Sequence, residues 1–134
     1  MMLLLDTHVL IWLVEGNERL GSDTLETINQ SLADGQLGVA SISFWEIAML
    51  IEKGRLEFCI ELDTWRHDLL QDGLQEVPLT GSAAIQAGQF KAFHGDPADR
   101  MIVATALERG ATLVTADKKI LGWNKLKQTI DASR

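Results

Sequence analysis

Four acidic residues lie where strand-like runs end or helix-like stretches begin. Asp6 follows the apolar run 3–5, Glu46 follows the run 37–40, Asp99 opens a predicted helix, and Asp117 follows the run 113–115. In an open sheet of parallel strands, ligands bind beyond the carboxyl ends of the strands, so we expect these acids to meet at one edge. Two unit charges about 4 Å apart repel by about 4 kcal/mol at an effective dielectric of about 20. A converging set of carboxylates therefore predicts a bound cation.

The residue types also indicate which cation and which reaction. Mg²⁺ prefers oxygen ligands, and it is usually held by one or two carboxylates together with waters and substrate phosphate. Four acids could hold one ion, or two ions about 3.5–4 Å apart, in an arrangement that promotes the attack of water on phosphorus. We therefore expect a Mg²⁺-dependent enzyme acting on phosphate esters, with Mn²⁺ as a possible substitute. This chemistry requires no Ser, His or Cys nucleophile.

Helix capping is the structural alternative for most of these acids. Asp6 precedes a predicted short helix and Asp117 precedes another at 118–123, and the N-cap is a common position for Asp. Asp96 is expected to cap the helix that follows it, which leaves Asp99 at the third helical position, where a carboxylate gains from the helix dipole. Only the agreement of four acids at one sheet edge favours the metal site, with Asp96 in a supporting role.

Glu46 is the most informative of the four, because it is the only charge in the apolar stretch 43–51. A Glu side chain is rarely buried unless it is paired or bound to a ligand. The alternative is a capping box in which Glu46 reaches back to Ser43. Thr7 and Thr115 could orient ligands or water, although a local cap or turn hydrogen bond is the favoured interpretation for both.

Histidine and cysteine offer little evidence of further chemistry. His8, His67 and His94 share no metal-ligand spacing, so each is interpreted as a packing or surface residue. Cys59 is the only cysteine, which excludes an intramolecular disulfide and a thiolate-rich zinc site.

The net charge of −7 argues against a protein that holds nucleic acid by bulk electrostatics, because such affinity comes mainly from Lys and Arg. It also favours a basic protein partner. No apolar run approaches the roughly 18 residues typical of a membrane span. The apolar residues 1–16 lack a basic region and a cleavage site, so we expect a cytoplasmic protein rather than a secreted one.

The elements that must position the acids alternate between strand-like and helix-like stretches, which predicts a mostly parallel sheet covered by helices on both faces. The length fits one domain spanning residues 1–134. The predicted strands cover residues 2–6, 37–40, 74–77, 111–115 and 126–130. The predicted helices cover residues 8–14, 23–33, 44–52, 64–71, 80–90, 98–109 and 118–123. The expected caps or opening residues of four of them are Ser22, Ser43, Asp63 and Thr80.

In order and spacing, four stretches resemble the PIN-domain family, specifically VapC-like toxins of type II toxin–antitoxin pairs. The stretches are LDTHVLIW at 5–12, SFWEIA at 43–48, HGDPADR at 94–100 with IVA at 102–104, and LVTAD at 113–117. Ala98 departs from the family, in which Phe is frequent at that position, but no ligand is lost.

The resemblance implies a three-layer α/β/α fold with a mostly parallel sheet of about four to five strands. It also implies a Mg²⁺-dependent endoribonuclease that cleaves RNA and is neutralised by a cognate antitoxin. The implied catalytic and metal-binding residues are Asp6, Glu46, Asp99 and Asp117, with possible support from Asp96.

Other protein classes with acids at a sheet edge fit less well. A haloacid-dehalogenase-type phosphatase needs a second Asp two residues after the first, and that position is His8. A receiver-like domain needs an early acidic pair, a mid-chain Asp and a later Lys, and that order is missing. The remaining alternative is a non-catalytic RNA- or protein-binding module of the same fold, which a cleavage assay with an EDTA control would distinguish.

The helix predicted at 44–52 carries two apolar strips. Phe44, Ile47, Leu50 and Ile51 can face the core, whereas Trp45 and Met49 form a strip on another face. An additional apolar patch usually marks an interaction site, which leads us to expect a homodimer that also binds a basic antitoxin. The alternative is that other helices of the same chain cover this strip.

Overall fold

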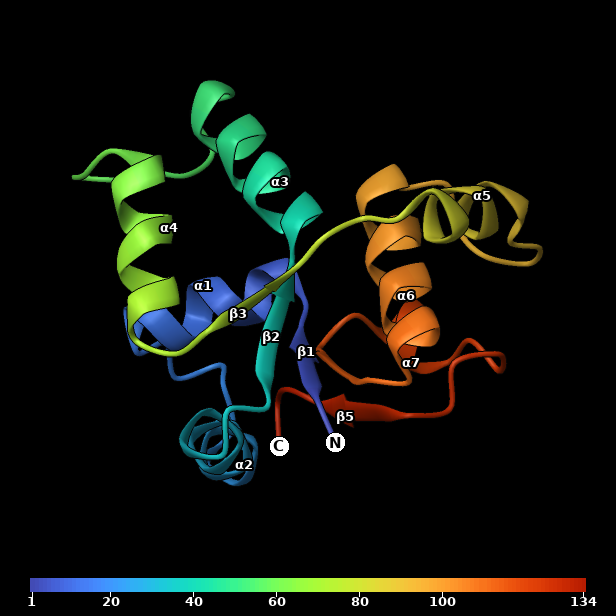
Figure 1. The fold of residues 1–134 in the computed structure, drawn as a ribbon, viewed down its shortest axis with the longest axis horizontal. Helices are drawn as coiled ribbons and strands as arrows, with labels where there is room; N and C mark the ends of the chain where they lie inside the picture. The colour runs from blue at the N-terminus through green and yellow to red at the C-terminus, as the bar shows by residue number, and fades with distance from the viewer.

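A five-stranded, wholly parallel sheet forms the centre of the computed structural model, which describes residues 1–134 (Figure 1). The strand order is β3-β2-β1-β4-β5. The strands are β1 (Leu3–Leu5), β2 (Leu37–Ala40), β3 (Gln75–Val77), β4 (Thr112–Thr115) and β5 (Thr129–Asp131). The helices are α1 (Thr7–Glu15), α2 (Ser22–Ala33), α3 (Ser41–Glu52), α4 (Leu62–Gln71), α5 (Gly81–Gln89), α6 (Pro97–Arg109) and α7 (Lys118–Leu121).

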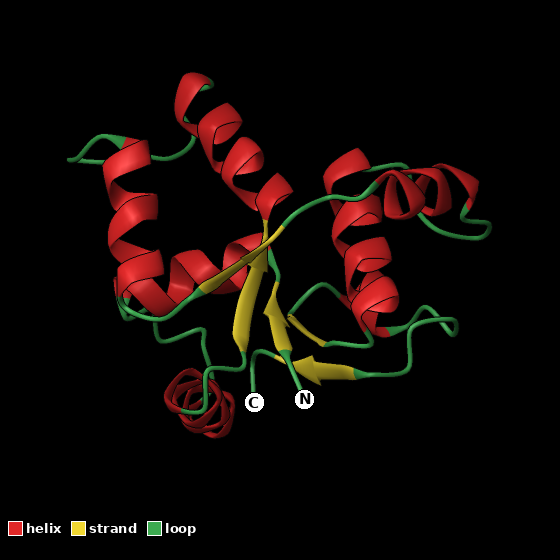
Figure 2. Ribbon diagram, viewed as in Figure 1, coloured by secondary structure: helices red, strands yellow, loops and turns green.

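Helices cover both faces of the sheet, which is why its central strands are continuously apolar. Alternate side chains of β1 point to opposite faces. Leu3 and Leu5 join the core beneath α1–α4, whereas Leu4 joins a second core beneath α6 and α7. Figure 2 shows these two groups of helices on either side of the strands. The predicted three-layer α/β/α architecture is confirmed.

Helix α5 lies against α6 and outside the layer that contacts the sheet (Figure 1). The contact is made by small side chains, with Ala83 and Ala87 of α5 packing on Ala104 of α6. Because α6 is buried between the sheet and α5, its first turn is held in a fixed position. That turn carries Asp99.

The strand order places the carboxyl end of β1 at the point where the chain changes direction across the sheet. After β1 the chain adds β2 and β3 on one side, and it then crosses to add β4 and β5 on the other. Leu5 is in register with Val39 of β2 and Val114 of β4. Such a switch point is where ligands bind in open α/β sheets. Asp6, the next residue after β1, therefore lies at its centre.

Several predicted boundaries need correction. The last strand is β5 at 129–131 rather than 126–130, and the N-cap position of α4 is held by Glu61 rather than Asp63, without a side-chain cap bond. Helix α2 already includes Ser22, with Gly21 in the cap position. Helix α3 begins at Ser41 directly after β2, so the expected cap Ser43 lies inside the helix. None of the helices is long and apolar enough to cross a membrane.

Candidate metal-binding site

The four sequence-predicted acids come together beyond the carboxyl ends of β1, β2 and β4. Asp6 directly follows β1, and Asp117 is the second residue after β4; they are the N-caps of α1 and α7. Glu46 lies in the second turn of α3, and Asp99 lies in the first turn of α6. Capping and membership of the cluster are therefore compatible for Asp6 and Asp117, because a carboxylate has two oxygens.

Asp6 is the buried centre of the cluster, with 2% of its surface exposed. Its Oδ1 accepts the backbone N–H of Thr7 at 2.8 Å, and its Oδ2 accepts the hydroxyl of Thr115 at 2.8 Å. Burial raises the pKa of Asp6, and the nearby Asp117 raises it further, whereas His8 and these two hydrogen bonds lower it. The carboxylate is thus fixed in orientation and costly to charge in the absence of a cation.

Thr115 connects Asp6 to Asp117. Its Oγ1 donates to Asp6 and also accepts the backbone N–H of Asp117 at 3.1 Å, so it makes the expected local turn bond and orients an acid as well. Asp117 Oδ1 accepts the N–H of Lys119 at 2.8 Å, which caps α7. Thr7 was expected to make a local bond, but its hydroxyl donates to Ser43 of α3 at 2.9 Å.

Glu46 does not form the capping box that was its structural alternative. Ser43 is the third residue of α3, and its hydroxyl accepts a hydrogen bond from the hydroxyl of Thr7. The Oε1 atom of Glu46 is buried and has no hydrogen-bond partner. Burial raises the pKa of Glu46, the nearby Thr7 hydroxyl lowers it, and the carboxylates of Asp6 and Asp99 raise it further. An unpartnered buried oxygen on a carboxylate that lies beside other acids fits a cation ligand.

Asp99 is held through its backbone by Asp96 and through its side chain by His94. Its backbone N–H donates to Asp96 Oδ1 at 3.0 Å, which confirms Asp96 as the N-cap of α6. Its Oδ2 lies 2.6 Å from Nε2 of His94. Burial, with a contribution from Asp6, raises the pKa of Asp99 to about 6, although the bond to His94 opposes this effect.

Two overlapping groups of side chains could hold a divalent cation, and they share Asp99. In each group every residue offers one ligand atom, and these atoms lie within 4.8 Å of one another. The groups are Glu46, Asp96 and Asp99, and His94, Asp99 and Asp117. Asp6 lies beside both, close enough to raise the pKa of Glu46 and of Asp99. The donor set and the unpartnered Glu46 oxygen fit Mg²⁺ or Mn²⁺.

Two histidines interpreted from sequence as packing or surface residues are part of this site. His8 Nε2 accepts the backbone N–H of Ala116 at 3.0 Å, and its Nδ1 lies 3.7 Å from Asp6 Oδ2. His94 contacts Asp99 directly. Metal-ligand spacing could not identify His94, because this residue lies in an irregular loop rather than on a helix or strand. The one available signal was its position two residues before Asp96, the N-cap of α6.

A groove of about 250 Å³ lies beside Glu46, between α3 and the start of α6. Trp45 and Met49 line it as the second apolar strip, and Trp45 is 50% exposed. The helices of this chain therefore leave the strip open. Leu50 also lines the groove, contrary to the expectation that it faces the core. The remaining lining residues are Lys53, Arg55, Asp96, Pro97 and Ala98.

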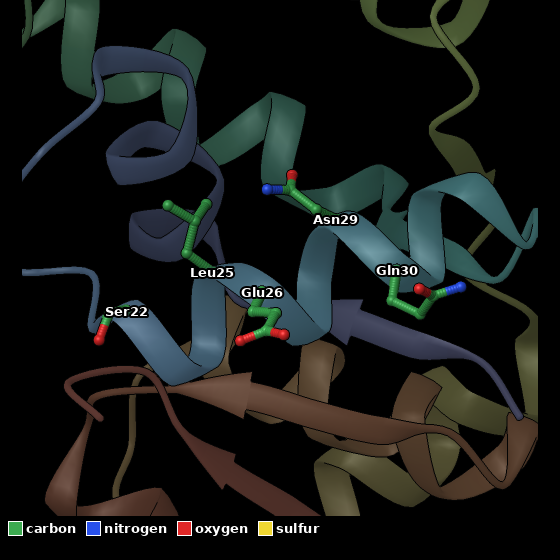
Figure 3. A pocket seen from close by; sticks show the side chains of 5 residues that line it. All are labelled: Ser22, Leu25, Glu26, Asn29 and Gln30. Carbon is green, nitrogen blue, oxygen red and sulfur yellow. The ribbon is translucent and has the colours of Figure 1, made fainter.

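A larger hollow of about 430 Å³ lies on the outer surface of α2 (Figure 3). Its lining residues are Ser22, Leu25, Glu26, Asn29 and Gln30, all from this one helix. Helix α2 lies towards the amino ends of the strands, away from the acids (Figure 1). This depression brings together no residues from different parts of the chain, because all of its lining residues belong to one helix. The acidic cluster therefore remains the candidate site.

Comparison with known proteins places the chain in a recognised family. The PIN domain profile matches residues 3–123. Ribonuclease VapC22 from Mycobacterium tuberculosis (strain ATCC 25618 / H37Rv) is 37% identical over 118 residues, which cover 87% of this chain and 88% of that protein.

Solved structures share the fold. DNA-bound VapBC from Salmonella typhimurium matches with a TM-score of 0.71 and 21% identity, covering 98% of each chain. VapBC2 from Rickettsia felis, bound to a DNA fragment from its promoter, matches with a TM-score of 0.69 and 15% identity, covering 97% of this chain and 96% of that one. At these identities the matches show the fold alone.

The raised pKa of Asp99 predicts that the metal-free protein loses stability as pH rises. The folded carboxyl keeps its proton up to about pH 6, whereas the unfolded one releases it near pH 3.8. The folded state binds more protons between these values, so the free energy of unfolding should fall across this window, by up to about 3 kcal/mol. Denaturant unfolding in EDTA at several pH values measures this. Asp99→Asn should flatten the profile, and an unchanged profile would contradict the assignment.

Proposed function

This chain belongs to the PIN-domain family, and we propose that it is a VapC-type toxin that hydrolyses RNA phosphodiester bonds at its acidic cluster with a divalent cation. In this proposal residues 1–134 act as one PIN-like domain and a cognate antitoxin protein neutralises the activity. The relationship to Ribonuclease VapC22 supports the reaction class. RNA as substrate also favours a cytoplasmic location.

The carboxylates that converge at this sheet edge are costly to charge together, which supports a bound cation. Burial raises the pKa values of Asp6, Glu46 and Asp99, and each of these three also experiences repulsion from neighbouring acids. A protein that needed only helix caps could use Ser or Asn at Asp6 and Asp117 without this cost. The retained charges fit a cation, and Mg²⁺ is the ion that an oxygen-rich set favours, with Mn²⁺ as a substitute.

Each of the four acids would contribute differently to binding the cation, depending on its surroundings. Asp6 is hydrogen bonded at both oxygens and buried, so it serves as the fixed anchor. Glu46 and Asp99 reach the site from α3 and α6, which lie on different faces of the sheet. Asp117 completes the cluster beside Asp6. When bound, the cation supplies positive charge that stabilises the negative charge developing on the phosphate and makes an attacking water easier to deprotonate.

Removing any one acid should abolish most RNA cleavage. Asp6→Asn, Glu46→Gln, Asp99→Asn and Asp117→Asn each delete one negative charge with little change of shape. We expect each to lower the Mg²⁺-dependent rate by more than the roughly 10–100-fold typical of residues that only support a ligand. Metal-free stability should stay equal or rise, because repulsion among the remaining carboxylates decreases.

The matched control is Glu26→Gln on α2, which removes an exposed acid far from the cluster and should leave cleavage unchanged. Cleavage by the unmodified protein should stop in EDTA and return with Mg²⁺ or Mn²⁺. If two or more of the four site variants cleaved RNA like the unmodified protein in a nuclease-free preparation, the site would be wrong. RNA binding without any cleavage would favour the non-catalytic alternative.

The groove beside Glu46 supports an antitoxin-binding surface. It joins the exposed Trp45 and the apolar Met49 and Leu50 to the acidic site, because Glu46 and Asp96 also line it. An amphipathic helix of the antitoxin would place apolar side chains in this groove. A basic residue of that helix would reach the carboxylates, where Arg makes strong charge-assisted hydrogen bonds. Such a partner would exclude cation and substrate together.

Trp45→Glu should weaken capture of the antitoxin encoded by the neighbouring gene, because a charge would replace an apolar anchor. Leu25→Glu on α2 is the control, since it also replaces an exposed apolar residue but at a distance from the groove. Pull-down of the co-expressed partner compares the two variants. Equal capture by both would contradict the proposed surface.

We also propose that the protein is a homodimer, since the exposed Ile85 of α5 leaves apolar surface outside this groove for self-association. Light scattering of the purified protein should give twice the monomer mass. A monomer at all accessible concentrations would contradict this.

A further inference from the structure

The bond between His94 and Asp99 has a defined direction. Nε2 of His94 lies 2.6 Å from Asp99 Oδ2, and both side chains are largely buried, with 19% and 17% of their surfaces exposed. The other ring nitrogen, Nδ1, is buried and has no hydrogen-bond partner. A proton on Nδ1 would leave a buried donor unpaired and would set an unprotonated Nε2 against the carboxylate oxygen, which also only accepts. The neutral ring therefore carries its proton on Nε2 and donates it to Asp99.

The loop that carries His94 is held by a dedicated side chain. Arg100, one residue beyond Asp99, directs its guanidinium away from the acids and into this loop. Its Nε donates to the carbonyl of His94 at 2.9 Å and its Nη2 to that of Phe93 at 3.0 Å. Its Nη1 donates to the carbonyls of Ala87 and Phe90 at 2.9 and 3.4 Å. The planar, always charged guanidinium thus fixes the loop relative to the first turn of α6.

The same loop is under local backbone strain. Ala92 is the only residue other than glycine with a positive φ, at 57°. An L-residue in this region costs roughly 1–2 kcal/mol, and such costs are found where the surroundings over-determine a functional geometry. The ring of Phe93 stacks on His94 with centroids 4.4 Å apart and also packs edge-on against Trp123. The strained backbone, the hydrogen bonds of Arg100 and the aromatic packing together fix the position of the His94 imidazole.

From this geometry we infer that His94 is a positioning residue that donates from Nε2 to Asp99 Oδ2 and thereby fixes the orientation in which the Asp99 carboxylate would bind the cation. The inference rests on the proposed function, because it concerns the same site. His94 then does not ligate the ion itself, although its nitrogen lies among potential ligand atoms. With Oδ2 held by His94, the orientation of Asp99 no longer depends on the ion. Carboxylates that ligate metals are commonly fixed in this way by outer hydrogen bonds.

Two substitutions separate the hydrogen bond from the packing of the ring. His94→Phe keeps the stack on Phe93 but removes the donor, whereas His94→Gln places an amide N–H near the position of Nε2. His67→Phe is the matched control, because His67 is an exposed histidine on α4. Mn²⁺ affinity is measured by the electron paramagnetic resonance of free Mn²⁺, which requires no RNA.

We expect His94→Phe to weaken Mn²⁺ binding about 10–100-fold, His94→Gln to restore most of the loss, and His67→Phe to match the unmodified protein. Unchanged binding in His94→Phe would overturn the inference, as would equal weakening in His94→Phe and His94→Gln. Absence of Mn²⁺ binding by the unmodified protein would overturn the metal proposal and this inference with it.

A second measurement decides the matter even if His94→Phe fails to fold. Nitrogen NMR of the unmodified protein, labelled at histidine and saturated with Mg²⁺, reports which ring nitrogen of His94 carries the proton. A protonated Nε2 is expected if it donates to Asp99 in the metal-loaded state. An Nε2 without a proton would show that it ligates the ion or accepts from Asp99, and either result would overturn the inference.

Discussion

The burial of Asp6 at the end of the central strand is the constraint on which the rest of the site depends. The parallel sheet leaves its switch point beyond β1, and the side chain there is a carboxylate with 2% of its surface exposed. Thr7 N–H and the Thr115 hydroxyl fix it, which also fixes the positions of β4 and of Asp117 relative to β1. Every further acid that approaches must overcome repulsion from this buried charge. The fold therefore holds an arrangement that is unfavourable until a cation binds.

The same arrangement connects the site to a possible regulator. Glu46 belongs both to the cluster and to the groove lined by Trp45 and Met49, so a ligand of the groove lies directly beside the acids. A partner that brings its own positive charge would satisfy the carboxylates in place of the ion. A basic partner and a metal ion would then bind the same carboxylates, so that each would exclude the other. The net charge of −7 adds a general attraction for a basic partner.

Much of this structure was predictable from sequence because short-range signals and the sheet topology agree. The buried runs at 3–5, 37–40 and 112–115 read as strands, and the acids after them meet because carboxyl ends of parallel strands share an edge. Ser43 was predicted to cap its helix, and its spacing to Glu46 allowed a capping box. The structure contains neither. In the structure β2 runs directly into α3, so Ser43 lies inside the helix, bonds to Thr7 and forms no capping box with Glu46. His94 was missed because its position depends on a loop held by Arg100, which no periodic pattern records.

Thermal unfolding with and without divalent cation measures whether the folded carboxylates form a cation site. If the carboxylates form a cation site only when folded, Mg²⁺ or Mn²⁺ should raise the melting temperature, with a stabilisation of about 2.7 kcal/mol at a concentration 100 times the dissociation constant. Asp99→Asn, which removes the acid shared by both groups of ligands, should show a much smaller shift. An equal shift in Asp99→Asn and the unmodified protein, or none in either, would contradict the account.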